Sequence, residues 1–254
     1  MKKKRNQLEN KALILGMILS GAKVSEAEFT FSSVSEGIAK YLVFLLKRVY
    51  KYNANIEEAN IQSSKFLHTY NVVCSGALNI LEDLEVHNFG QFKKQIEESD
   101  NLAAAYICGA FLARGSVNDP ETSKYHFEIT LDDPKNVTFV QHVMNERSFN
   151  AKIIKRRNRL VLYLKEAEKI VDIIRFIGAN NQAFLYEDLR IERDFNNSIN
   201  RIINCEVANE QKTISNELAA NALQTSRTLN QITQNMNKVS QSTSKTNEEA
   251  KITQ

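Results

Sequence analysis

The stretch ILGMILSGA at residues 14–22 decides the fold, because the stretch ICGAFLARG at residues 107–115 repeats its pattern. Each stretch reads as a short apolar helix with one small residue, Gly16 or Gly109, where a second helix could approach closely. The same order of elements follows both stretches: a strand, an amphipathic helix and then further strand. A repeated unit that cannot bury its own apolar face is best explained by packing against its twin. The sequence therefore predicts two helices that cross face to face at these glycines.

The repeated helix resembles the paired motif helices of LAGLIDADG homing endonucleases, in which a carboxylate near the end of each helix holds the metal that cuts DNA. When Gly16 and Gly109 are aligned on the motif glycine, the carboxylate positions are occupied by Gly21 and Arg114. A cation such as Mg²⁺ needs oxygen ligands, preferably carboxylates, and Arg114 adds a positive charge instead. The resemblance implies an endonuclease scaffold without nuclease activity, and we expect no enzyme activity, metal or cofactor. The apolar pattern alone also fits an ordinary pair of packed helices.

The segment after the second repeat points to one particular family with this kind of domain. The run NSINRIINCEVANEQKT at residues 197–213 resembles the sequence with which WhiA-type regulators leave their endonuclease-like domain. The second repeat supports the same family through GAFLARGSVNDP at 109–120, YHFEI at 125–129 and VLYLK at 161–165. The match covers roughly residues 100–215 most closely. It implies a DNA-associated regulator of sporulation, cell division or chromosome segregation, cytoplasmic and associated with the nucleoid.

We therefore predict an α+β fold, a degenerate LAGLIDADG endonuclease-like pseudo-two-fold repeat followed by a C-terminal helical extension. The first repeat is assigned to residues 1–90, the second to 91–195, and a linker with a helical or partly disordered tail to 196–254. The polar run at 85–100 is expected to connect the repeats. The predicted elements are helices at 8–20, 35–52, 75–84 and 134–147, and strands at 27–32, 54–61, 66–70 and 125–130.

The family pattern normally continues into a C-terminal helix-turn-helix domain, and this sequence departs from it. A helix-turn-helix needs a recognition helix braced by other helices over a small core. From Ala220 onward no second or third helix of such a module is evident. Either the protein is naturally degenerate or the chain ends early, and both put sequence-specific reading of duplex DNA in doubt.

The clearest hairpin in the sequence spans residues 151–165. Two runs rich in β-forming residues, KIIK at 152–155 and LVLYL at 160–164, flank a turn in which Asn158 tolerates the required conformation. The hairpin carries five basic residues and no acid: Lys152, Lys155, Arg156, Arg157 and Arg159.

Two explanations of these basic residues are open from the spacing alone. They could be a solvated turn whose charges keep a sheet edge from aggregating. In the endonuclease-like fold, however, sheet surfaces form the saddle that lies on DNA. The resemblance therefore implies that the hairpin contacts DNA, and Arg201 is assigned to DNA binding with it.

The tail supports a second hypothesis of a different class. Its apolar residues form a narrow helical stripe of the kind used in coiled coils: Ile214, Leu218, Ala222, Leu229, Ile232, Met236 and Val239. The chain could thus be a protein-interaction module that binds another regulatory protein through its C-terminal helix, without reading DNA itself. A frayed or disordered end after Ser240 is the alternative for the last residues.

Composition excludes several other classes. The 254 residues carry a formal net charge of +3, far from the strongly basic balance that marks many nucleic-acid-binding domains. No uncharged stretch is long enough to cross a bilayer, and no signal peptide is evident, so we expect a cytoplasmic protein without a membrane partner.

The four histidines lack metal-ligand spacing, and no phosphate-binding glycine loop is found. Cys74, Cys108 and Cys205 lie far apart, which favours small core residues over disulfides or a zinc site.

Overall fold

The computed structural model describes residues 5–60, 68–88, 90–119, 121, 125–157 and 159–252, without the side chains of Asn60 and of residues 246–252. Pro120 and Asn158 lie outside this part of the chain, as do positions 61, 66 and 67 of the predicted strands. The chain divides into an N-terminal unit that ends at Glu192 and a C-terminal unit that begins at Arg193. Each unit is described below by itself.

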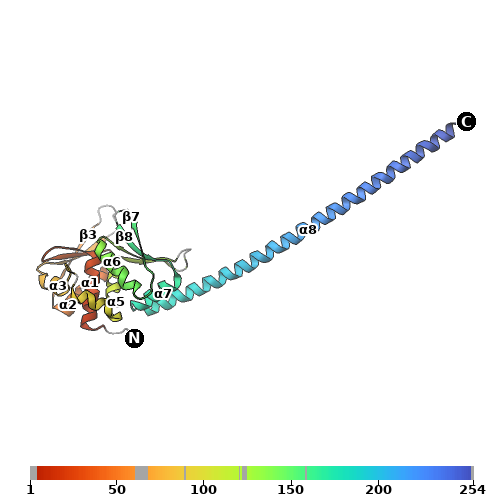
Figure 1. Cartoon of the computed structure of the whole chain (residues 1–254). Helices are drawn as coiled ribbons and strands as arrows, with labels where there is room; N and C mark the ends of the chain where they lie inside the picture. Colours follow the sequence, from red (N-terminus) through yellow and green to blue (C-terminus); the bar gives the residue numbers. More distant parts are fainter. Residues whose placement is uncertain are drawn as a thin grey trace. The chain divides into compact units, whose positions relative to one another are not determined.

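The N-terminal unit contains the same series of elements twice. The first series is α1 (Gln7–Gly21), β1 (Ala22–Val24), β2 (Phe29–Ser33), α2 (Glu36–Tyr50), β3 (Asn55–Asn60), β4 (His68–Cys74) and α3 (Leu78–Asp83). After α4 (Gln91–Glu98), the second series is α5 (Asp100–Arg114), β5 (Gly115–Val117), β6 (Phe127–Leu131), α6 (Pro134–Asn145), β7 (Lys152–Arg156), β8 (Arg159–Leu164) and α7 (Ala167–Phe176). The chain continues as α8 (Asn180–Ile252). Figure 1 follows this order by colour.

Each series builds one four-stranded antiparallel sheet, and the two sheets have the same strand order. The first sheet is β1-β2-β4-β3 and the second is β5-β6-β8-β7. Successive side chains of a strand point to opposite faces, and one face of each sheet is apolar. Phe29 and Phe31 of β2, and Phe127 and Ile129 of β6, are fully or almost fully buried in the core. The α+β class and the internal repeat predicted from the sequence are thus confirmed.

Local sequence explains where the main helices begin. The Asn6 side chain accepts a hydrogen bond from the Glu9 amide (2.8 Å), and the Glu9 carboxylate accepts one from the Asn6 amide (3.2 Å), which makes a capping box at the start of α1. Ser35 caps α2, and Asp133 caps α6 with Pro134 in its first turn.

The polar run that connects the repeats contains a helix that was not predicted. Residues 91–98 form α4, which buries Phe92 and Ile96. Glu85 stabilises its first turn, because the Glu85 carboxylate accepts a hydrogen bond from the Phe92 amide (2.7 Å). A two-turn helix with one buried residue in each turn is too short to show a periodic pattern. The short edge strands β1 and β5 and helix α7 were also not predicted.

The cysteines differ from one another in their environment. Cys74 is buried in the first sheet, and burial raises the pKa of its thiol to about 12. Cys108 is half-buried on α5. Cys205 is exposed on α8, so the prediction that all three cysteines are core residues is wrong for Cys205.

Asn136 links the two repeats through buried hydrogen bonds. The Tyr106 hydroxyl of α5 donates to Asn136 Oδ1, and Asn136 Nδ2 donates to the Leu19 carbonyl oxygen of α1 (3.0 Å). Tyr106 is fully buried, and this burial raises the pKa of its hydroxyl. One side chain of α6 therefore satisfies polar groups on both central helices.

We expect Asn136→Ala to destabilise the N-terminal unit by about 2 kcal/mol or more, because the substitution leaves the Tyr106 hydroxyl and the Leu19 carbonyl unpaired in the interior. Tyr106→Phe removes only one donor and should cost less, about 1 kcal/mol. Urea unfolding measures both values. Equal midpoints for Asn136→Ala and the parent would contradict the proposed role of this side chain.

Candidate nucleic-acid interface

The helices α1 and α5 cross at their glycines with direct backbone contact. A Cβ atom on Gly16 would overlap the carbonyl oxygen of Tyr106 and lie 3.0 Å from the Ala110 amide nitrogen. A Cβ atom on Gly109 would overlap the carbonyl oxygen of Leu13 and lie 2.9 Å from the Met17 amide nitrogen. The two repeats thus make equivalent contacts at the crossing. No residue larger than glycine fits at either position without separating the helices.

Gly21 and Arg114 occupy corresponding positions, since they are the last residues of α1 and α5. A Cβ atom on Gly21 would lie 2.6 Å from the Phe31 ring and 3.0 Å from Ala113 Cβ, so a carboxylate side chain would be crowded there. Arg114 is exposed. Among the described residues, no group of three or more His, Cys, Asp or Glu side chains is arranged to hold a metal ion.

The basic hairpin lies in the second sheet, and Figure 1 shows it at the upper edge of the N-terminal unit. Strands β7 and β8 pair in an antiparallel register that places Lys152 opposite Tyr163 and Arg156 opposite Arg159. Arg157 follows β7 in a left-handed conformation, with a φ of 55°. Tight two-residue hairpin turns require such a conformation. The sequence pattern indicated this conformation for Asn158 and did not indicate it for Arg157.

The strand alternation separates the five basic residues of the hairpin. Lys152 and Arg156 share one face of β7 with Ile154, whereas Lys155 belongs to the other face. The face that carries Arg156 is the outward one, because the buried residues Phe127, Ile129 and Leu131 of β6 lie on the opposite face of the sheet. All five basic residues are exposed.

Two of the basic residues have acidic partners from outside the hairpin. Arg156 Nη1 lies 3.3 Å from Glu128 Oε2 of β6, and Arg159 Nε lies 3.7 Å from Asp132 Oδ1, just after β6. For Lys152, Lys155 and Arg157, no carboxylate of a described residue lies within ion-pair distance. The hairpin segment itself contains no acidic residue, but in the folded protein Glu128 and Asp132 partly neutralise its positive charge.

A polar and aromatic cluster continues the outward face beyond Glu128. The His126 Nε2 atom lies 2.9 Å from Glu128 Oε2, and the His126 ring stacks on Tyr163 with a centroid separation of 6.0 Å. The Lys165 ammonium lies 5.2 Å from the centre of the Tyr163 ring. Sequence reasoning missed these residues as a site. Side chains alternate along β8, so the sequence could have placed Tyr163 on the same face as Arg159. The pairing of β8 with β6, which brings Glu128 next to Tyr163, could not be predicted from the sequence of β8.

The outward face of the first sheet is much less charged. It pairs Lys23 with Thr30 and Ser32 with Asn71, and the Ser32 hydroxyl donates to Asn71 Oδ1 (2.8 Å). Glu57 lies next to Asn71 on β3. The positive charge of the two sheets is therefore concentrated on the second repeat. Arg201, the remaining predicted DNA contact, is exposed on α8 in the C-terminal unit.

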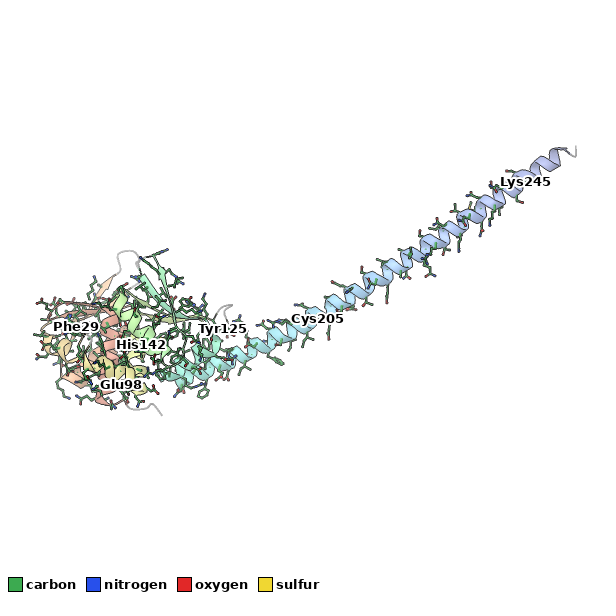
Figure 2. All side chains as sticks on the ribbon, viewed as in Figure 1. Phe29, Glu98, Tyr125, His142, Cys205 and Lys245 are labelled. Carbon is green, nitrogen blue, oxygen red and sulfur yellow. The ribbon has the colours of Figure 1, made fainter. Side chains whose placement is uncertain are left out.

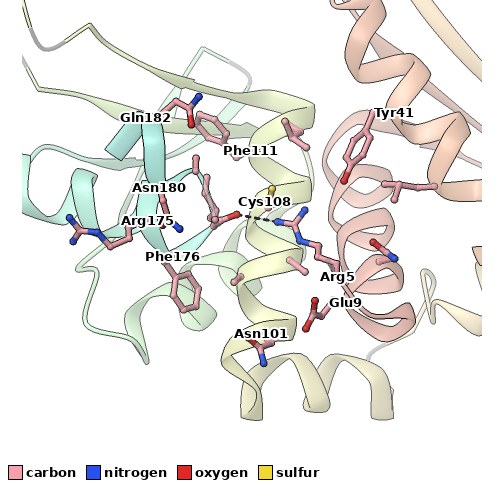
Figure 3. Close-up of a pocket in the computed structure, with 18 of the residues that line it drawn as sticks. Arg5, Glu9, Tyr41, Asn101, Cys108, Phe111, Arg175, Phe176, Asn180 and Gln182 are labelled. Atoms are coloured by element: carbon pink, nitrogen blue, oxygen red, sulfur yellow. Dashed lines mark hydrogen bonds between the residues drawn. The ribbon is translucent and has the colours of Figure 1, made fainter. Parts of the chain in front are cut away.

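A cavity of about 1010 Å³ lies on the helical side of the N-terminal unit (Figure 3). Arg5 reaches across it and donates a hydrogen bond to the Ile177 carbonyl oxygen (3.1 Å), shown as the dashed line. Other polar groups around it are engaged as well: Glu9 caps α1, and Arg175 forms ion pairs with Asp172 (3.6 Å) and Glu187 (3.0 Å). We therefore regard the outward face of the second sheet as the stronger candidate site.

Two antiparallel sheets that repeat one topology around a pair of glycine-bearing helices define a LAGLIDADG-like domain. Residues 103–196 match the family model described as the WhiA LAGLIDADG-like domain. The chain is 42% identical over 185 residues to a probable cell division protein WhiA of Lysinibacillus sphaericus, an alignment that covers 70% of this chain and 58% of that protein. It is 36% identical over 221 residues to the protein of the same name from Staphylococcus aureus, covering 83% of this chain and 70% of that one.

The chain belongs to the WhiA family. The crystal structure of full-length DUF199/WhiA from Thermatoga maritima has the same fold, with a TM-score of 0.60 and 22% sequence identity over 79% of this chain and 67% of that one. The chain spans less than two thirds of the Lysinibacillus protein, its matched share being 58%. None of the helices in the described part of the chain is long and apolar enough to cross a membrane.

Proposed function

We propose that this chain is a non-catalytic DNA-binding regulator of the WhiA type, linked to cell division, sporulation or chromosome segregation. The observation that carries the proposal is the exposed basic hairpin, with Lys152, Arg156 and Arg159 on the outward face of the second sheet. The family name links its relatives to cell division. The DNA-binding role and the lack of catalysis are our inferences for this chain.

The shape of the hairpin suits duplex DNA. β7 is the edge strand of the second sheet, so the hairpin would enter the major groove, which is about 12 Å wide, from that edge. A strand of five residues such as β7 extends roughly 17 Å, enough to cross several phosphates. Lysine ammonium groups neutralise phosphates, and an arginine guanidinium can also donate two hydrogen bonds to the O6 and N7 atoms of guanine. On the outward face, Lys152 would therefore act on the backbone, whereas Arg156 and Arg159 could reach base edges.

Glu128 is expected to oppose DNA binding. Its carboxylate lies on the outward face, 3.3 Å from Arg156, where a phosphate would otherwise bind. We expect Glu128→Gln to raise the affinity for duplex DNA by about fivefold at low salt, because one nearby negative charge is removed and Arg156 is freed. A matched control is Glu98→Gln, which changes the net charge equally at an exposed position of α4. Fluorescence anisotropy measures both; an equal gain in the control would contradict this role of Glu128.

We further expect no cleavage of DNA in the presence of Mg²⁺ or Mn²⁺. The positions that correspond to the metal-binding carboxylates are Gly21 and Arg114, so two metal ions cannot be held there by side-chain oxygens. Incubation of supercoiled and linear DNA with the purified protein tests this expectation. Specific cutting that disappears with EDTA and survives repeated purification would overturn it.

The proposed function is tested by titrating a labelled duplex with the full chain at two salt concentrations. Phosphate contacts release counterions, so the affinity should fall steeply as salt rises. Absence of binding at low salt would contradict the proposal. One observation favours a second function: large apolar residues, among them Leu218 and Met236, are exposed along α8. In that case the chain acts as a protein-interaction module and its hairpin is not required.

A further inference from the structure

The C-terminal unit is a single helix with an uncovered apolar surface. Beyond Arg193 it consists of the rest of α8, and every described side chain from residue 196 to 245 is exposed (Figure 2). Leu218 is 70% exposed and Met236 is 67% exposed. Most helical stability in proteins comes from the packing of an apolar face and not from helix propensity, and this helix is rich in Asn, Ser and Thr, which favour helix less than Ala or Leu. Burial of the apolar residues would supply the missing stabilisation.

Six of the large apolar residues of this helix are spaced at eleven positions or a multiple of eleven. One row contains Ile203, Ile214 and Met236, with Thr225 at the position between Ile214 and Met236. A second row contains Val207, Leu218 and Leu229. We refer to these six apolar residues as the apolar stripe. Eleven residues make about three turns of an α-helix, so both rows stay on one face over the whole distance. Sequences with an eleven-residue apolar repeat form coiled coils that are nearly straight or right-handed.

We infer that α8 pairs with α8 of a second copy of this chain through the apolar stripe, as a two-stranded coiled coil over residues 203–236. The repeat is self-complementary, since two identical helices present the same rows to one another. Thr225 does not disrupt the stripe, because its hydroxyl already donates to the Asn221 carbonyl oxygen of its own helix (2.9 Å). The inference depends on α8 alone and goes beyond the proposed DNA-binding function.

The distribution of charge on α8 favours a second copy. At about 100° per residue, Arg227 and Lys238 project roughly 140° to 160° away from the centre of the stripe. Lys212 projects to the same distant side. The three acids of this region, Glu206, Glu210 and Glu217, lie along one flank. Two stripes can therefore meet with the three cations outside the contact, while Glu210, about 60° from the centre of the stripe, lies at the edge of the contact, where it stays in reach of water.

The area of the stripe is sufficient for a stable pair. The stripe extends from Ile203 to Met236, or about 50 Å of helix. Its six side chains each expose roughly 100 Å², so pairing two stripes would bury about 1,200 Å² in total, which is the lower bound for specific interfaces. Small residues beside the stripe, such as Ser215, Ala222 and Ser226, allow the helices to approach closely.

Sedimentation equilibrium of the full chain tests this inference. We expect a species of twice the 29.0 kDa chain mass that dissociates on dilution. The double variant Leu218→Ser/Leu229→Ser should weaken the dimer by at least about tenfold per substitution. Leu223→Ser is the matched control, because Leu223 is 55% exposed on the same helix but points about 160° away from the stripe.

The outcomes distinguish the inference from its competitors. A dimer that Leu223→Ser leaves intact and that the double variant dissociates, while circular dichroism shows the N-terminal unit folded, supports pairing through the stripe. A monomeric parent at about 100 μM, or a dimer that the double variant leaves unchanged, overturns it. Equal weakening by Leu223→Ser also overturns it, because the pairing would then not follow the stripe. DNA titration of the same variants shows separately whether the proposed function holds.

Discussion

Gly109→Leu is expected to destabilise the N-terminal unit by about 3 kcal/mol or more. The side chain would have to occupy the space of the Leu13 carbonyl and of the Met17 amide, which are backbone atoms of α1 and cannot rotate away. The helices would separate, and the hydrophobic core around Ile14, Met17 and Ile107 would open. Thermal unfolding should show a Tm that is lower by roughly 6 to 12 °C for a unit of this size.

Gly37→Ala is the matched control for this substitution. Gly37 lies in α2, where an added Cβ would meet only the Ser35 hydroxyl oxygen at 3.7 Å. Alanine favours helix over glycine, so this change should stabilise the protein by about 0.5 kcal/mol. The Cβ atom that Gly109→Ala adds already overlaps the Leu13 carbonyl oxygen, so this substitution should destabilise the protein. If Gly109→Leu unfolded at the same denaturant midpoint as the parent, the paired-helix packing would be wrong.

Neutralising the hairpin should produce the second large effect. The variant Lys155→Gln/Arg156→Gln/Arg157→Asn/Arg159→Gln removes four exposed positive charges from β7, the turn and β8. It also leaves Glu128 and Asp132 without their arginine partners, so the outward face loses most of its positive charge. We expect the affinity for duplex DNA to fall by about a hundredfold or more at moderate salt. Anisotropy titration gives the ratio.

The fold should tolerate this variant. Exposed ion pairs contribute about 1 kcal/mol or less, and asparagine adopts the left-handed conformation of Arg157 more readily than arginine. The charge-matched control neutralises four cations elsewhere: Lys47→Gln, Arg48→Gln, Lys51→Asn and Lys94→Gln. Lys51 is replaced by Asn because it too has a positive φ, 58°. A control whose affinity fell as far as that of the hairpin variant would show that net charge alone matters.

The features that the sequence predicted well are those with short-range patterns. The two glycine-bearing helices were recognisable because each pattern lies within nine residues and occurs twice. The hairpin was recognisable because β-branched residues flank a turn of basic residues, and the structure has β7 and β8 at these positions. In both cases the local physics of helix packing and turn geometry determines the element without reference to the rest of the chain.

The features that the sequence did not predict depend on contacts between segments that are far apart in the chain. Glu128 reaches Arg156 only because β6 pairs with β8 in a register that places Glu128 opposite Tyr163. A register between strands about thirty positions apart in the chain is set by the apolar faces of both strands and by the core beneath them. The sequence therefore indicated a purely basic hairpin, whereas the folded surface is mixed. Helix α4 was missed for a related reason, since its two apolar residues become core residues only when α5 is beside them.

The salt dependence of DNA binding by the parent and by the hairpin variant tests the role of the hairpin most directly. The binding constant of each should be measured over about 50 to 200 mM salt, and the slope of log K against log salt compared. If the hairpin lies on DNA, the slope of the variant should be smaller by about 0.9 for each phosphate that the variant no longer neutralises, and its affinity should be lower at every salt concentration. An unchanged slope and affinity, with the fold intact by circular dichroism, would remove the hairpin from DNA binding and favour an interaction module that acts through α8.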